Sequence, residues 1–221
     1  LLWTLAAGVA EAIYFGTLAR ALDLGRLGAV YTVSRGGAVL VVWPLSIVLF
    51  SEIATATSAA GSVLVLFGLG LSSLGSTGGG NQRHRAGIAW AAACAISIAG
   101  YHLSYKAALL SGGNPSATFA VSLGLSAVIS VIRIGSEGRR TLVTVVRARA
   151  PRILLMGVVC GGSFLILMEA LARGGSGYVL TLRNTSVLFA AGLAWTIGER
   201  PRGSEMIGAV FVAAGAVLMS L

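Results

Sequence analysis

The chain has 221 residues, of which 56% are hydrophobic and 10% are charged. A soluble domain usually carries about 25% charged residues. The apolar residues run in blocks of roughly 20, long enough to cross about 30 Å of hydrocarbon as a helix. Strict alternation of apolar and polar residues is absent, which favours helices over a barrel. These features exclude an ordinary soluble domain and predict an all-α membrane protein.

The net charge of +9 does not indicate a nucleic-acid partner. The basic residues lie in short segments between apolar blocks, where they are typical of determinants of membrane topology. Both cysteines, Cys94 and Cys160, fall inside apolar blocks, so we expect a packing role for them. The sequence has no His/Cys/Asp cluster and no phosphate-binding loop, so we expect no metal site, no cofactor and no ATP-driven pump.

In chain order, the hydropathy pattern predicts a polytopic bundle of about eight transmembrane helices. They are expected at residues 1–19, 28–50, 55–75, 87–109, 116–134, 153–172, 177–197 and 203–221. The chain opens directly in an apolar block at Leu1, without a start methionine or a signal peptide. We therefore expect at least one helix to precede Leu1 in the parent protein.

Two connections are long. The Gly-rich and polar residues 76–86 are expected to form a flexible linker between one domain at 1–75 and a second at 87–221. The connection at 135–152 is rich in arginine, but its centre, Thr141 to Val146, is apolar enough to lie at the membrane interface as a short amphipathic turn.

The loops differ strongly in basic charge. Those after the first, third, fifth and seventh predicted spans hold Arg20, Arg26, Arg83, Arg85, Arg139, Arg140, Arg147, Arg149, Arg152, Arg200 and Arg202. The alternate loops have only Lys106 and Arg173 at their edges. The positive-inside rule places the first group of loops in the cytoplasm.

The two ends of the chain repeat each other. Residues 52–74 align with 199–221 without gaps and match at eight of 23 positions, among them Gly61 with Gly208 and Gly68 with Gly215. Upstream, residues 21–32 resemble 170–181 at an offset that differs by two. The first three spans therefore correspond to the last three.

The sixth span comes five spans after the first. Because five is odd, the two copies have opposite orientations in the membrane. Inverted-topology repeats are typical of secondary transporters, whose substrate site lies near the midplane between the repeats. A second copy of five spans would also place two missing helices before Leu1.

This arrangement looks like the EamA-type branch of the drug/metabolite transporter superfamily. That family has two inverted five-helix repeats, and the fourth helix of each ends in a Gly-Glu-Arg turn. Here Gly198-Glu199-Arg200 fits the turn, and Ser51-Glu52-Ile53 is its degenerate partner. Ser34-Arg35-Gly36 is similar to the family's Ser-Arg-Gly stretch. The resemblance covers essentially the whole chain through the order and spacing of these motifs.

The resemblance implies a secondary transporter, a permease or exporter, for a small metabolite or drug-like solute in a prokaryotic inner membrane. A homodimer is one assembly compatible with this class, and a proton gradient is one candidate energy source. The family's ends are usually cytoplasmic, whereas ten helices and the arginine distribution place both ends outside. Either the parent has an odd number of helices or the Arg-rich loop is extracytoplasmic.

Ionisable residues inside membrane spans need a partner or a function, because burying them is costly. An antiparallel hairpin of the first two spans puts Glu11 at nearly the depth of Arg35, which predicts an ion pair. The sixth and seventh spans offer Glu169 and Arg183 at depths that long side chains can bridge. Arginines on both sides of a shared cavity would suit a carboxylate or phosphate, and Glu11 could accept a coupling proton. Charge-neutralised packing pairs are the alternative.

Other candidates are weaker. His102 in the fourth span could relay protons, although a helical histidine more often bonds to a neighbour. Tyr14 could line a cavity. Gly61, Gly68, Gly208 and Gly215 are expected to serve helix packing, since a spacing of seven keeps each pair on one helical face.

Two other functions compete with a carrier. Arg35 at depth could make an anion-selective channel. An intramembrane peptidase is suggested by Gly174-Gly175-Ser176-Gly177. Serine catalysis needs a base within hydrogen-bond reach, and the repeat assigns these glycines to a turn. We therefore expect no enzymatic activity.

Overall fold

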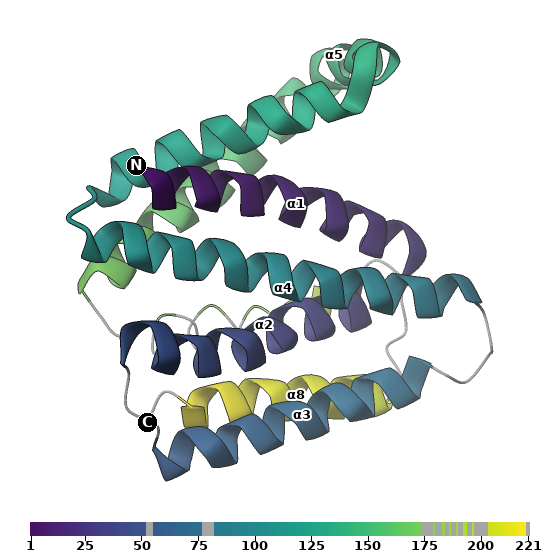
Figure 1. The fold of residues 1–221 in the computed structure, drawn as a ribbon. Coiled ribbons are helices and arrows are strands. Elements are labelled where there is room, and N and C mark those ends of the chain that lie inside the picture. Colours follow the sequence, from purple (N-terminus) through teal and green to yellow (C-terminus); the bar gives the residue numbers. More distant parts are fainter. Residues whose placement is uncertain are drawn as a thin grey trace.

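The computed structural model describes residues 1–51, 55–76, 82–173 and 203–219, together with Val179, Arg183, Ser186, Phe189, Gly192, Leu193 and Thr196. These parts of the chain form α1 (Leu2–Leu24), α2 (Leu27–Phe50), α3 (Ala56–Ser76), α4 (Gln82–Leu110), α5 (Pro115–Arg173) and α8 (Gly203–Met219) (Figure 1). Helices α1, α2, α4 and α5 are each long and apolar enough to cross a membrane. The prediction of an all-α membrane helix bundle is confirmed.

Helix α5 combines the predicted fifth and sixth spans. Its backbone leaves helical geometry at Gly135, with φ 74°, and at Arg149, with φ −126° and ψ 24°. The rings of Phe119 and Phe164 stack with centroids 5.4 Å apart, so the two arms at 115–134 and 150–173 fold back on each other. The amphipathic turn expected at 141–146 is wrong in extent, because helix continues through the whole stretch between the two breaks.

Part of the stretch predicted as a linker is helical. Helix α4 begins at Gln82, so residues 82–86 are helical, while 77–81 lie outside the described residues. Glutamine and arginine are good helix formers. Arg83 also donates a hydrogen bond to the Asp23 carbonyl oxygen at 3.1 Å, which ties the start of α4 to the end of α1. Most of the predicted seventh span, at 177–197, falls among the undescribed residues.

Helix α4 lies between α1 and α2 (Figure 1) and packs against both. Small residues such as Ala7, Ala91 and Ala95 are almost completely buried and let these helices approach closely. Large apolar side chains cover the exterior instead. Leu154 and Ile166, for example, are 70% and 73% exposed. An apolar outer surface of this kind suits contact with lipid.

The four glycines singled out in the sequence lie where α3 packs along α8 (Figure 1). A Cβ atom added to Gly68 would lie 2.6 Å from the Gly208 carbonyl oxygen. A Cβ added to Gly215 would lie 2.6 Å from the Gly61 carbonyl oxygen. Only glycine permits this backbone contact.

The α3–α8 contact has internal symmetry. Exchanging each residue for its counterpart in the repeat converts the Gly68–Gly208 contact into the Gly215–Gly61 contact. Since Gly68 meets Gly208 while Gly61 meets Gly215, the two helices run antiparallel. Corresponding helices of opposite direction are what an inverted-topology repeat requires.

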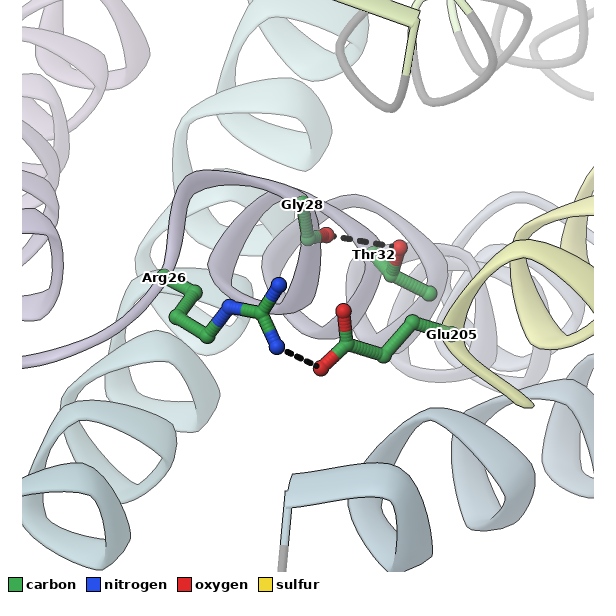
Figure 2. Close-up of polar contacts among 4 residues, drawn as sticks. All are labelled: Arg26, Gly28, Thr32 and Glu205. Carbon is green, nitrogen blue, oxygen red and sulfur yellow. Dashed lines mark hydrogen bonds and ion pairs between the residues drawn. The ribbon is translucent and has the colours of Figure 1, made fainter. Parts of the chain in front are cut away.

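An ion pair also joins the two copies. Arg26, in the turn before α2, donates from Nη1 to Oε1 of Glu205 in the first turn of α8, at 2.9 Å. Figure 2 shows this pair beside Thr32, whose hydroxyl donates to the Gly28 carbonyl oxygen at 2.8 Å. The Glu205 side chain is 5% exposed and the Arg26 side chain 32%. A carboxylate in the first turn of a helix is also favoured by the helix dipole.

We expect Arg26→Gln to lower the free energy of unfolding by about 1–3 kcal/mol, because a mostly buried carboxylate loses a charge-assisted hydrogen bond. Thermal unfolding in detergent measures the change. Arg173→Gln is the matched control, since the Arg173–Glu169 pair is largely exposed and should contribute about 0–0.5 kcal/mol. Equal effects of the two substitutions would contradict a stabilising role for the Arg26–Glu205 pair.

Candidate functional site

A cavity of about 610 Å³ lies among helices from both halves of the chain. Helix α1 contributes Glu11 and Tyr14, and α2 contributes Tyr31 and Arg35. Both arms of α5 supply wall residues, including Phe119 and Phe164. Of the residues described between α5 and α8, Val179, Arg183, Ser186 and Phe189 complete the lining. The wall is mostly apolar with a few polar groups, as is usual for small-molecule sites.

Two guanidinium groups face this cavity. Nη1 of Arg35 and Nη2 of Arg183 are buried and have no hydrogen-bond partner in the described part of the chain. The hydroxyl of Ser186, also on the cavity wall, is buried without a partner. Buried polar groups are nearly always satisfied, so a cluster of unsatisfied ones requires an explanation. A ligand with hydrogen-bond acceptors would satisfy both arginines.

Aromatic side chains hold Arg183 in place. Its Cζ lies 4.6 Å from the ring centroid of Phe164 and 5.4 Å from that of Tyr101. Nη1 of Arg183 also contacts Nε2 of His102, which is buried on α4. Because a guanidinium is only a donor, Nε2 of His102 is the acceptor in this contact. His102 thus lies behind Arg183 and positions it rather than lining the cavity.

Glu11 is held by α4 and α5. Its carboxylate accepts a hydrogen bond from Tyr105 at 2.6 Å and one from Ser122 at 3.3 Å. Tyr105 and Ser122 are themselves 2.6 Å apart. The predicted Glu11–Arg35 ion pair is therefore wrong. A hairpin of α1 and α2 would place both residues at the same depth, but α4 lies between these two helices (Figure 1). Glu11 therefore contacts Tyr105 of α4.

The predicted approach of Glu169 to Arg183 is also wrong. Glu169 binds Arg173, one helical turn further along α5, at 3.1 Å. Its side chain is 45% exposed, and it does not line the cavity. A glutamate and an arginine four residues apart on a helix pair locally. This short-range partner competes with the longer reach to another span.

Much of the cavity wall could not be predicted from the sequence. Tyr31, Phe119, Phe164 and Phe189 line the cavity, but single aromatic residues in apolar spans carry no signal that separates a cavity wall from a lipid-facing surface. Ser122, which binds Glu11, is one of five hydroxyl residues in the predicted span 116–134, so nothing in the sequence separates it from the other four. Ser176 and the glycines around it lie outside the described residues.

The helical fold and the enclosed polar groups define the chain as an integral membrane protein of the kind that handles small solutes. A family model for the EamA-like transporter family matches residues 85–221, more than half of the chain. The chain therefore belongs to the EamA-like transporter family, whose members are membrane transporters. Searches among curated proteins and among solved structures found no match.

Proposed function

We propose that the chain is a secondary transporter that moves a small organic anion, with a carboxylate or phosphate group, across a prokaryotic cell membrane by alternating access. One observation carries the proposal. Arg35 and Arg183 come from corresponding spans of the two repeat copies, and each presents an unpartnered guanidinium nitrogen at the same cavity.

The chemistry of arginine supports an anion. A guanidinium group offers a planar fork of donors that matches carboxylate and phosphate oxygens. Neither arginine forms a direct ion pair among the described residues, and the two guanidinium groups outnumber the one carboxylate on the cavity wall, Glu11, so a bound anion would neutralise the remaining positive charge. The rings of Phe119 and Phe164 would contact the apolar body of the solute. Because each arginine belongs to a different copy, movement of one copy against the other would change how both arginines contact the anion.

A matched pair of solutes tests the proposal in proteoliposomes. We expect saturable uptake of small carboxylates and little uptake of the corresponding primary amides, which have the same shape but no charge. Preloading with unlabelled carboxylate should accelerate uptake of the labelled one, as exchange by a carrier requires. Equal uptake of acid and amide would overturn the proposal that the solute is an anion. Flux that neither saturates nor exchanges would instead indicate a channel.

Glu11 is the proposed site of the coupling proton. It lies on the cavity wall, is 2% exposed, and has hydroxyl partners rather than a cation. Neutral glutamine can keep the hydrogen bonds to Tyr105 and Ser122 while losing the titratable group. We expect Glu11→Gln to abolish accumulation driven by an imposed proton gradient but to retain exchange of labelled for unlabelled solute. Gradient-driven accumulation at the normal level in this variant would exclude Glu11 as the coupling site.

A further inference from the structure

The stretch between the arms of α5 forms a distinct surface, which we call the basic segment and define as residues 136–152. It is helical up to the break at Arg149 and begins directly after the break at Gly135. Every residue from Arg139 to Arg152 is exposed. In Figure 1 the middle of α5 is seen nearly end-on at the edge of the molecule, away from the other helices.

The charge of the basic segment is strongly unbalanced. It contains Arg139, Arg140, Arg147, Arg149 and Arg152, with Glu137 as its one carboxylate. None of these arginines forms an ion pair within the described residues, although Arg139 donates from Nε to the Gly135 carbonyl oxygen at 3.0 Å. The positive charge of the basic segment is therefore available to a partner outside the chain.

The helix of the basic segment is also amphipathic. At about 100° per residue, Leu142, Val145 and Val146 share one side. Arg140 and Arg147 lie on the opposite side together with Val143, while Arg139 lies beside Val146 at the edge of the apolar side. Leu142 and Val145 are 39% and 44% exposed, so the apolar side is not covered by the described helices.

The position of the basic segment between two membrane-spanning arms indicates which surface it contacts. It joins two apolar arms of a membrane protein, both with lipid-facing side chains such as Ile132 and Leu154. A helix connecting two such arms lies at the bilayer surface, where phospholipid phosphates are the nearest anions. An amphipathic helix with a basic side is suited to lie in this plane with its apolar side toward the acyl chains.

We propose that the basic segment binds anionic phospholipid headgroups, with its arginines on the phosphates and with Leu142, Val145 and Val146 at the acyl boundary. Each arginine near an anionic surface strengthens such binding about fivefold. This inference does not depend on the solute that the cavity takes.

Hydrogen exchange of the full chain in nanodiscs tests the proposal. We compare phosphatidylcholine alone with phosphatidylcholine plus phosphatidylglycerol. Backbone amides of residues 139–147 should exchange more slowly with the anionic lipid, by about fivefold for each arginine that engages. The triple variant Arg139→Gln, Arg140→Gln, Arg147→Gln should lose this protection, while exchange in α1 reports that the fold is intact.

Three further comparisons decide the interpretation. The triple arginine-to-lysine variant keeps the charge and should stay protected; its loss of protection would contradict an electrostatic contact with the lipid headgroups. Arg173→Gln, at the far end of the 150–173 arm of α5, should not change exchange in the basic segment. Inorganic phosphate added to nanodiscs of phosphatidylcholine alone should give no protection. The proposal is overturned if phosphate alone protects the segment or if both bilayers give the same exchange.

Discussion

Arg35→Gln and Arg183→Gln should each lower the transport of an anionic solute by about 10- to 100-fold. A hydrogen bond to a charged group contributes about 1.5–3 kcal/mol, and about 1.4 kcal/mol corresponds to a factor of ten. Both guanidinium groups have buried nitrogens without a hydrogen-bond partner among the described residues, so we expect each substitution to remove an interaction with the solute. Initial rates of uptake into proteoliposomes measure the loss.

Stability distinguishes a binding role from a structural one. Burying a cation without a carboxylate partner is unfavourable, so Arg35→Gln should leave the thermal unfolding temperature unchanged or raise it while transport falls. Arg35→Lys keeps the charge but not the fork, and intermediate transport is expected. Arg20→Gln, on the exposed side of α1, is the control and should behave as the unaltered chain. If Arg35→Gln unfolds at a clearly lower temperature, Arg35 serves packing rather than the solute.

The fold was predictable because long apolar blocks force helices in lipid, whatever their tertiary contacts. What hydropathy cannot predict is which helices are neighbours. The insertion of α4 between α1 and α2 depends on the burial of small residues such as Ala91 and Ala95. The spacing of these residues in the sequence does not predict which helix packs against them. The error over the Glu11–Arg35 pair follows directly, since it assumed that helices adjacent in sequence are adjacent in space.

The candidate site was partly predictable for a similar reason. A charged or polar group in an apolar span is costly, so Glu11, Arg35, Arg183 and His102 stand out in the sequence. Glu169 stood out equally, but it lies close enough to the end of α5 for Arg173 to bind it in an exposed position. The distance of a residue from the end of its helix separates Glu169 from the cavity residues. Helix ends are the least reliable part of a sequence prediction, so this distance could not be judged from the sequence.

The glycine contact between α3 and α8 should give substitution effects of opposite sign within one helix. Gly68→Ala places a Cβ 2.6 Å from the Gly208 carbonyl oxygen, and neither backbone can move without separating the helices. We expect a loss of about 3 kcal/mol in the free energy of unfolding, at the upper end of overpacking effects. Gly70→Ala, two residues on, meets nothing within 4 Å and should gain about 0.5–1 kcal/mol from helix propensity.

Gly215→Ala extends this test to the repeat itself. Its added Cβ would meet the Gly61 carbonyl oxygen at 2.6 Å and the Val65 backbone nitrogen at 2.8 Å. Gly68→Ala meets the Gly208 oxygen and the Val212 nitrogen at the same two distances. Equivalent contacts predict equal losses of stability, and thermal unfolding of the two variants side by side measures them. A large difference would mean that the two copies do not share this contact symmetrically, because one helix could then relax where its counterpart could not.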